Sequence, residues 1–542
     1  MHMPLHRGLL FAGTALGTYA IIQLLGSLTT HGRWYWRQWC SRRNQSAGLR
    51  EVISGAGPLP LPFLGNSLYF TRVGFFRALY ESCLKRQVTL LWFASSPLLV
   101  VSDANLVKQV LTSRIYEKPR YFGYRSRTVK AALELHQKAE LMRERIELGS
   151  TPESEANVED PSRAALLNLI DDSINLIAED TERFFEMLVA GEFAGKDTYR
   201  HIQQFYVKLN CKVLFGLCLS DKEAARIAMA IEKAGDEFSK RMILPQRGLF
   251  AWTANVSYIW NTSVLLLFGQ RILRHLRSSS HPWIHGWVGK VGRLRQLAKV
   301  LGLLMAATQT VPIAASWALI SIGSHDKIRR KLVVEARRLL AEHSPEKHLA
   351  DKADFDAVVT SETIAPASEF SLRHEKLKSN FLSDLFRKDS FIDATIRETL
   401  RLYPPFPIIQ RQAQCDNFLG DVLVPAGAIV AVVPWLMHHH PAYWNHAEVF
   451  DPDRWTSDGS DAYRHGDAPS DYCYIPFGRG RRMCAGNPLA MIELKCLVLF
   501  AALREHDWCC VVETRGNRSI ENSKIQFPSL TMRPPRFSLR NL

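Results

Sequence analysis

The pattern of apolar and polar positions predicts a mainly helical chain with a small region of strands. Residues 88–101 contain the apolar runs VTLLWF and LLVVS, separated by a turn at residues 95–97, which is typical of two short strands. Over residues 164–277 apolar positions recur every three or four residues, as amphipathic helices require. We therefore expect a mainly α fold with a small β-sheet region near its amino-terminal side.

Two polar stretches interrupt this pattern. Residues 136–163 include GSTPESEANVEDPSR, and residues 343–379 are similarly rich in charged and small polar residues. Such composition between periodic segments is typical of loops, so both stretches are predicted to be surface insertions.

The amino-terminal region has the character of a membrane anchor. Residues 8–28 form an uncharged apolar run, and about 20 such residues suffice for a helix to cross a bilayer. Aromatic residues and arginines follow at positions 33–43, which suits a membrane interface with the arginines on the cytosolic side. The alternative is a cleaved signal peptide, but no small-residue cleavage site follows the run. We predict a transmembrane anchor at residues 1–30, a basic and aromatic linker at residues 31–54 and one globular domain at residues 55–542.

A second apolar run, at residues 300–322, raises the alternative of a second membrane span. Thr308, Gln309, Thr310 and Pro312 interrupt it, and a crossing here would place two parts of the candidate site described below on opposite sides of a bilayer. A buried central helix is the better interpretation.

The charge balance narrows the class of partner. The chain carries 68 Lys and Arg against 53 Asp and Glu, a formal net charge of +15, which suits nucleic acid, an anionic membrane surface or an acidic protein. The sequence has no zinc-finger spacing, basic zipper or ribonucleoprotein motif, so nucleic acid is disfavoured. The ten cysteines form no C-x-x-C pair, which fits a reducing compartment and at most one cysteine with a chemical role.

The most specific segment is PFGRGRRMCAGNPLAMIE at residues 476–493. It contains F-x-x-G-x-R-x-C-x-G at Phe477, Gly480, Arg482, Cys484 and Gly486. Glycines allow a tight loop whose backbone can approach a flat cofactor. A helix that begins after the second glycine would direct its positive end at the sulfur and stabilise a thiolate.

This segment resembles the haem-ligand loop of the cytochrome P-450 family at all five positions. The resemblance implies a cytochrome P-450 fold with haem b, iron protoporphyrin IX, as cofactor. It implies that Cys484 is the axial ligand of the iron, that Phe477 shields one haem face, that Arg482 pairs with a propionate, and that Gly480 and Gly486 bring backbone close to the cofactor. The alternative is a buried structural cysteine in a glycine loop, which five matched positions disfavour.

Three charged residues match a structural network of the same family. Glu398 and Arg401, in ETLRLYPP, are neighbours on one face of a predicted helix, and Arg454 follows in FDPDRW. By the resemblance these three form a buried Glu-Arg-Arg network, and Arg411 is a second propionate partner. His438, His439 and His440 are adjacent residues that cannot easily converge on one metal ion, so we interpret them as loop residues.

The predicted central helix matches the oxygen-side helix of the family in MAATQTVP. Ala306 stands where a small residue leaves room over the iron, and Thr310 stands where a hydroxyl can hold an oxygen molecule or a water. Gln309 replaces the family's acid, and an amide cannot deliver protons as a carboxylic acid does.

The family's W-x-x-x-R is missing, because no tryptophan occurs between Trp92 and Trp252. The resemblance is good from about residue 58 to 121 and from residue 302 onward.

The resemblance implies an oxidoreductase. We expect a monooxygenase that hydroxylates or otherwise oxidises a hydrophobic small molecule with O2 and NADPH-derived electrons. Its partners would be NADPH-cytochrome P-450 reductase, docking on a basic surface that includes Arg479 and Arg481, together with a lipophilic substrate and membrane lipid. With its anchor, this domain at residues 55–542 would be a cytosolic catalytic domain of a single-pass endoplasmic reticulum protein. We expect a eukaryotic, fungal type that acts in secondary metabolism on a terpenoid, steroid or polyketide.

Two alternatives stay open at this point. The amide at Gln309 motivates a reductase-independent haem-thiolate isomerase or dehydratase. The missing W-x-x-x-R motivates a haem-binding sensor or carrier without turnover.

Overall fold

The computed structural model describes residues 66, 69–70, 74–93, 96–119, 161–190, 197–243, 256–279, 292–343, 385, 390–456, 472–504, 508–512 and 532–540. The predicted anchor at residues 1–30 and the linker at residues 31–54 lie outside the described residues, as do nearly all of the two polar insertions.

Helices make up most of the described chain. Residues 164–277, predicted to be helical from their periodicity, contain four long helices, which confirms that prediction. The helices are α4 (Phe75–Cys83), α5 (Ala104–Thr112), α7 (Pro161–Val189), α8 (Thr198–Phe215), α9 (Asp221–Ile243), α11 (Val256–Ser278), α12 (Arg293–Gly323), α13 (Asp326–His343), α16 (Phe391–Leu402), α17 (Pro434–His439) and α18 (Asn487–Leu503), with short 3-10 helices η6 (Pro452–Trp455) and η8 (Gly480–Arg482).

The strands of the described residues form one sheet of five strands and two small two-stranded sheets. The main sheet has the order β1-β2-β7-β4-β3, and its strands β1 and β2 pair in antiparallel fashion, as the two adjacent apolar runs predict. The strands are β1 (Val88–Phe93), β2 (Ser96–Val101), β3 (Tyr116–Glu117), β4 (Ile409–Ala413), β5 (Asn417–Leu419), β6 (Val422–Val424), β7 (Ile429–Val432), β8 (Cys509–Val512) and β9 (Phe537–Arg540).

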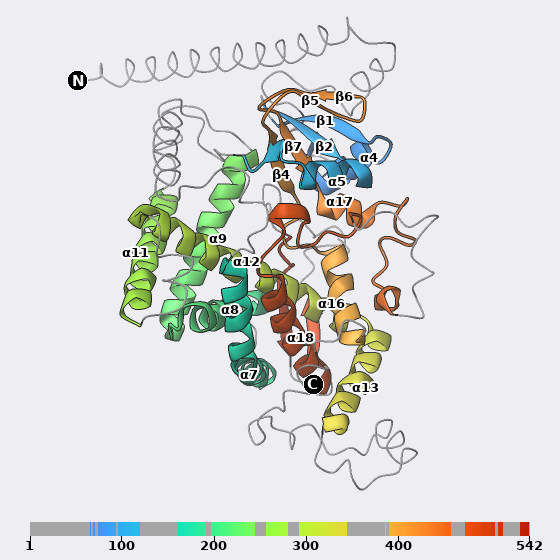
Figure 1. Ribbon diagram of the computed structural model, residues 1–542. Helices are drawn as coiled ribbons and strands as arrows, with labels where there is room; N and C mark the ends of the chain where they lie inside the picture. Colours follow the sequence, from blue (N-terminus) through green and yellow to red (C-terminus); the bar gives the residue numbers. More distant parts are fainter. Residues whose placement is uncertain are drawn as a thin grey trace, which may run out of the picture.

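The main sheet joins two segments that are about 300 residues apart in the chain. β2 runs parallel to β7, with Leu98 opposite Ile429 and Val101 opposite Val432. In Figure 1 the sheet lies at one end of the molecule with α4 and α5 beside it, while the long helices occupy the rest. The mainly α architecture with a small sheet is therefore confirmed.

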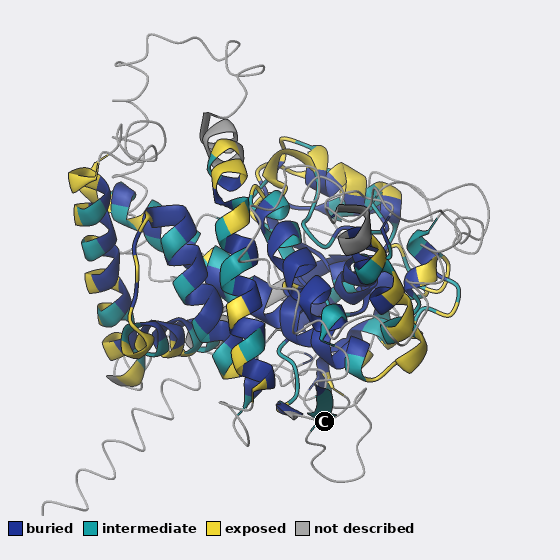
Figure 2. Ribbon diagram, turned by 90° about the horizontal axis from the view of Figure 1, so that it is seen from below, coloured by how far each residue is buried: buried dark blue, intermediate teal, exposed yellow. Residues whose placement is uncertain are grey.

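Helix α12 is the core helix that the sequence predicts for residues 300–322. Among the described helices it alone is long and apolar enough to cross a membrane, but 67% of its most apolar 18-residue stretch is buried inside the fold. Its second half, from Val311 to Ile322, is buried throughout, and it contains Pro312. Figure 2 shows the central helices buried along most of their length, with exposed residues mainly on the helices at the margin.

Contacts from distant segments hold α12 in the core. The indole N–H of Trp317 donates to the backbone oxygen of Met532 at 2.7 Å. The same ring stacks on Tyr403, with ring centroids 3.9 Å apart. Stacked aromatic rings of this kind contribute more than their buried area alone. The carboxy-terminal segment and the end of α16 are thereby fixed to the central helix.

One prediction about the histidine triplet is wrong. His438 and His439 are the last two residues of α17 rather than loop residues, and both are buried, while His440 follows the helix. Pro434 begins this short helix at a position where the missing proline N–H costs no helical bond. Because α17 packs between the sheet and α16, its histidines point into the interior.

Candidate functional site

The cysteine loop owes its shape to a glycine. Gly480 has a φ of +74°, and a side chain there would collide with the backbone oxygen of Leu111, so only glycine fits. The backbone N–H of Met483 donates to Gly480 at 3.0 Å, and that of Cys484 donates to the backbone oxygen of Phe477 at 2.9 Å. The loop therefore closes on itself and holds Cys484 opposite Phe477.

The sulfur of Cys484 lies at the start of α18. The backbone N–H groups of Gly486 and Asn487 donate hydrogen bonds to it, which lowers the pKa of the thiol, but burial raises that pKa more. The sequence predicts a stabilised thiolate; in the protein chain alone, desolvation exceeds the helix contribution. Neighbouring protein atoms desolvate the sulfur, although Cys484 as a whole residue is exposed. A cation beside the sulfur would reverse the balance.

Gly486 leaves one side of the sulfur clear. A side-chain carbon at Gly486 would lie 3.8 Å from the sulfur of Cys484. The backbone of Gly486 has a φ of −81°, which any residue can adopt, and 3.8 Å is an ordinary van der Waals distance, so within the described chain neither feature requires glycine at this position.

Three cations gather beside the loop. Arg411, on β4, is buried, and burial and the charge of Arg482 lower the pKa of its guanidinium. Burial, followed by the charges of Arg482 and Arg411, likewise lowers the pKa of Lys118. Glu117 partly offsets this charge, since Arg482 lies 3.5 Å from its carboxylate. The sequence identifies Arg411 and Arg482; Lys118 was missed, and its place directly after the short strand β3 gives no signal of it.

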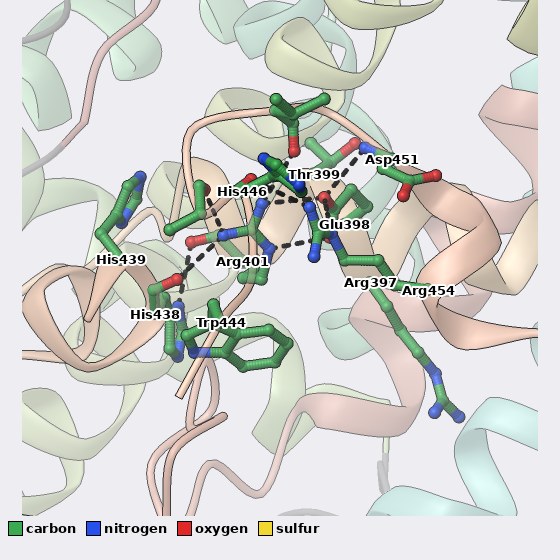
Figure 3. A network of polar contacts seen from close by, with 12 residues as sticks. Arg397, Glu398, Thr399, Arg401, His438, His439, Trp444, His446, Asp451 and Arg454 are labelled. Carbon is green, nitrogen blue, oxygen red and sulfur yellow. Dashed lines mark hydrogen bonds and ion pairs between the residues drawn. The ribbon is translucent and has the colours of Figure 1, made fainter. Parts of the chain in front are cut away.

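Glu398, Arg401 and Arg454 form the buried network that the sequence predicts (Figure 3). The guanidinium of Arg401 donates twice to the Glu398 carboxylate, at 2.8 Å each, and that of Arg454 donates to it at 3.2 Å. The backbone N–H of Asp451 and the indole of Trp455 complete the set at 2.9 and 3.0 Å. Both carboxylate oxygens of Glu398 thus accept hydrogen bonds from protein donors.

The remaining guanidinium donors of this network fix a loop. Arg401 donates to the backbone oxygens of His438 and Val449 at 2.9 and 3.0 Å. Arg454 donates to the backbone oxygen of His446, whose φ of 48° is unusual for a residue other than glycine. Buried charges of this kind are stable only when their hydrogen bonds are made, so the network acts as a rigid support.

His438 extends this network, although its sequence context offers no reason to select it. Its Nδ1 lies 3.1 Å from the backbone oxygen of Arg401, and its Nε2 accepts from the backbone N–H of Ile475 at 2.9 Å. Within the part of the chain that the structure describes, no group of three or more His, Cys, Asp or Glu side chains could hold a metal ion. Both ring nitrogens of His438 thus contact backbone groups.

One face of α12 carries small residues at accessible positions. Gly302 and Ala306 are exposed and Thr310 is half-buried, and the spacing of four places them in one row. A side-chain carbon at Gly302 would meet nothing within 4 Å. The Thr310 hydroxyl donates to the backbone oxygen of Ala306 at 3.0 Å, which leaves its lone pairs as acceptors.

Gln309 faces a different element. A side chain at Gly235 of α9 would collide with the amide of Gln309, so this amide lies against α9. Gly235 provides the room for it. The sequence could identify Gln309 as a departure from an acid but could not predict where its side chain packs.

The comparisons agree with these observations. Residues 380–540 match the family model described as Cytochrome P450. The chain is 33% identical over 138 residues to thromboxane-A synthase of Sus scrofa, covering 26% of this chain and 24% of the relative. It is 42% identical over 115 residues to cytochrome P450 4X1 of Mus musculus, covering 21% and 22%, and 31% identical over 148 residues to ferruginol synthase of Salvia fruticosa, covering 27% and 26%. The match spans about a quarter of the length of these curated relatives.

The fold and the cysteine loop fit a haem-thiolate protein. Residues 380–540 match the model of the cytochrome P450 family, whose members bind haem b. The residues present fit that cofactor: the sulfur of Cys484 receives two backbone N–H groups, and Gly486 leaves room beside it. The cluster of Arg411, Arg482 and Lys118 suits a group that carries two carboxylates.

Proposed function

We propose that the chain is a cytochrome P450 monooxygenase that oxidises a hydrophobic small molecule with O2 and electrons derived from NADPH. The observation that carries the proposal is the closed loop around Cys484, with its two backbone donors to the sulfur. A terpenoid, steroid or polyketide of secondary metabolism is the substrate class we favour. Ferruginol synthase and thromboxane-A synthase, whose names indicate synthesis of small molecules, support this class.

The residues of the chain divide the work of holding the haem. Cys484 would ligate the iron, with Phe477 against the same haem face, and Arg411, Arg482 and Lys118 would bind the propionates. When bound, the haem supplies the iron chemistry, in which thiolate ligation favours cleavage of an O–O bond.

The row of Gly302, Ala306 and Thr310 on α12 would shape the part of the site that receives the substrate. Gly302 and Ala306 add little volume, so they leave room for a substrate. The Thr310 hydroxyl can accept a hydrogen bond from a water or a substrate hydroxyl while it donates its own proton to the backbone oxygen of Ala306. Gln309 cannot act as an acid, and its amide lies against Gly235, so protons would have to reach the site through water.

The partners and the location are part of the same proposal. NADPH-cytochrome P-450 reductase would dock on the basic surface near the cysteine loop, where Arg479 is half-buried and Arg481 has a 52% exposed side chain. The apolar run at residues 8–28 would anchor the chain as a single-pass protein of the endoplasmic reticulum, with residues 55–542 in the cytosol as the catalytic domain.

Carbon monoxide difference spectroscopy tests the ligand. The reduced wild-type protein should show the red-shifted Soret band of thiolate ligation, and Cys484→His should abolish it. Cys473→Ser is a matched control, because Cys473 is a buried cysteine of the same segment. A wild-type protein without the band, or a Cys484→His variant that keeps it, would overturn the proposal.

A reductase-independent isomerase or dehydratase is the second candidate function. The specific observation in its favour is the amide of Gln309, which stands where the family has an acid and lies against α9. Product formation coupled to consumption of O2 and NADPH, in microsomes that contain the reductase, would exclude this candidate. A haem-binding sensor or carrier would give binding spectra with lipophilic compounds but no oxidised product.

A further inference from the structure

The ring of His438 joins two segments that are far apart in the chain. His438 has 0% exposed surface, and its two ring nitrogens reach different partners. Nδ1 lies 3.1 Å from the backbone oxygen of Arg401, at the end of α16, and Nε2 lies 2.9 Å from the backbone nitrogen of Ile475. A carbonyl oxygen only accepts and a backbone N–H only donates, so Nδ1 carries the proton and Nε2 does not. The partners fix one neutral tautomer.

Each end of this connection is itself tied to a larger structure. Arg401 belongs to the buried network with Glu398, and its guanidinium also donates to the backbone oxygen of His438 at 2.9 Å. Ile475 begins the cysteine loop: its backbone oxygen accepts from Gly478 at 3.0 Å, and two residues later Phe477 accepts from Cys484 at 2.9 Å. Figure 3 shows His438 beside Arg401 at the edge of the network.

We propose that His438 is a positioning residue for Cys484, which couples the Glu398–Arg401–Arg454 network to the first residue of the cysteine loop. This inference rests on the proposed function, since it assigns the loop to haem ligation. The network holds Arg401 in place, and His438 links the backbone of Arg401 to that of Ile475. The closed loop then links Ile475 to the sulfur of Cys484.

The surroundings keep the imidazole in the form that this role needs. Burial, joined by the positive charge of Arg401, lowers the pKa of His438 to about 3, although its backbone hydrogen bonds to α16 act in the opposite direction. The Tyr474 ring covers it, with centroids 5.3 Å apart. His438 therefore stays neutral at the pH of the cell, and its Nε2 remains an acceptor.

His438→Phe tests the role, because phenylalanine preserves a ring but makes neither bond. His439→Phe is the matched control: His439 is the next residue, is 1% exposed, and bonds through Nδ1 to Trp435 of its own helix. His438→Gln is the conservative variant, since its amide can still accept from Ile475. The first measurement is the rate at which the thiolate Soret band of the reduced carbon monoxide complex is lost under mild warming, at a temperature where circular dichroism shows the fold intact.

His438→Phe should lose the band about tenfold faster than the wild-type protein, because it leaves the backbone oxygen of Arg401 and the backbone N–H of Ile475 without their imidazole partner. His439→Phe should match the wild-type rate, and His438→Gln should lie between. The second measurement is hydrogen exchange of the 475–477 backbone, with or without haem, which should accelerate in His438→Phe alone. If His438→Phe does not fold, the Gln variant decides by the same two measurements.

The outcomes separate the two hypotheses. If His438→Phe and His439→Phe show equal band loss and equal exchange at residues 475–477, the positioning role is wrong. A wild-type protein that never shows the thiolate band overturns the proposed function itself, whatever the His438 variants do.

Discussion

Glu493 illustrates how burial changes the chemistry of a single residue. Its side chain is enclosed between α18 and α8, near Tyr206 and Asn210. Burial raises the pKa of this carboxyl from 4.5 to about 8, and a contact with Asn210 opposes the rise only in part. At neutral pH the folded protein therefore holds a proton here that the unfolded chain has released.

The stability of the protein should consequently fall as pH rises from about 4.5 to about 8. Below pH 4.5 the Glu493 carboxyl is protonated in both the folded and the unfolded state. Between pH 4.5 and about 8 only the folded state keeps the proton, and the free-energy cost of keeping it increases with pH. Glu493→Gln removes the titration, so the variant should gain at least about 2 kcal/mol over the wild-type protein between pH 5 and pH 8.

Urea unfolding at pH 5, 6.5 and 8 measures this difference. Glu179→Gln is the control, because Glu179 lies on the surface of α7 with a 46% exposed side chain. Parallel pH curves for the Glu493→Gln variant and the wild-type protein would contradict the prediction.

At the scale of elements, the support of the site depends on how α16 is tied to η6. Arg454 and Asp453 are adjacent on η6 but have opposite surroundings. The Arg454 side chain is 4% exposed and donates to Glu398, whereas Asp453 pairs with Lys331 at 2.7 Å through side chains about half exposed. The same short helix thus offers a buried and an exposed ion pair for comparison.

Arg454→Ala should destabilise the fold by about 3 to 5 kcal/mol, because it leaves buried groups unpaired. Lys331→Ala should cost about 1 kcal/mol or less, since water screens the exposed pair. Chemical unfolding of both variants checks this contrast, with the haem content after purification as a second measurement. Equal losses in the two variants would show that the buried network contributes no more than a surface pair.

At the scale of the whole molecule, the positive net charge of +15 should govern the encounter with the electron donor. Arg481 places exposed charge next to the cysteine loop, although Glu117 partly offsets it. An acidic flavin domain would be attracted to this region over about 10 Å at 0.1 M salt.

Reduction of the haem by the reductase should therefore slow several-fold when the ionic strength rises from about 0.05 to 0.5 M. Turnover driven by an organic hydroperoxide, which replaces both O2 and the reductase, serves as the control and should change little. Stopped-flow measurement of the first electron transfer separates this effect from later steps. A rate independent of salt would exclude electrostatic steering at this surface.

The sequence by itself determined the elements and the glycine-shaped loop that contains Cys484, because both depend on residues that are neighbours in the chain. The apolar runs at residues 88–101 became β1 and β2, the periodic stretch at residues 164–277 became long helices, and residues 300–322 became the buried part of α12. Gly480 could be predicted because a tight loop restricts backbone angles locally. Glu398, Arg401 and Arg454 could be predicted from their motif.

Only the tertiary structure decided which distant residues meet. The pairing of β2 with β7, the cation cluster that adds Lys118, and the contact between Gln309 and Gly235 all join segments with no periodic relation in the sequence. The same is true of His438, which we interpreted as a loop residue and which is instead a buried connection to the cysteine loop. Local propensity acts over a few residues, whereas burial and hydrogen-bond partners are set by the packing of the whole chain.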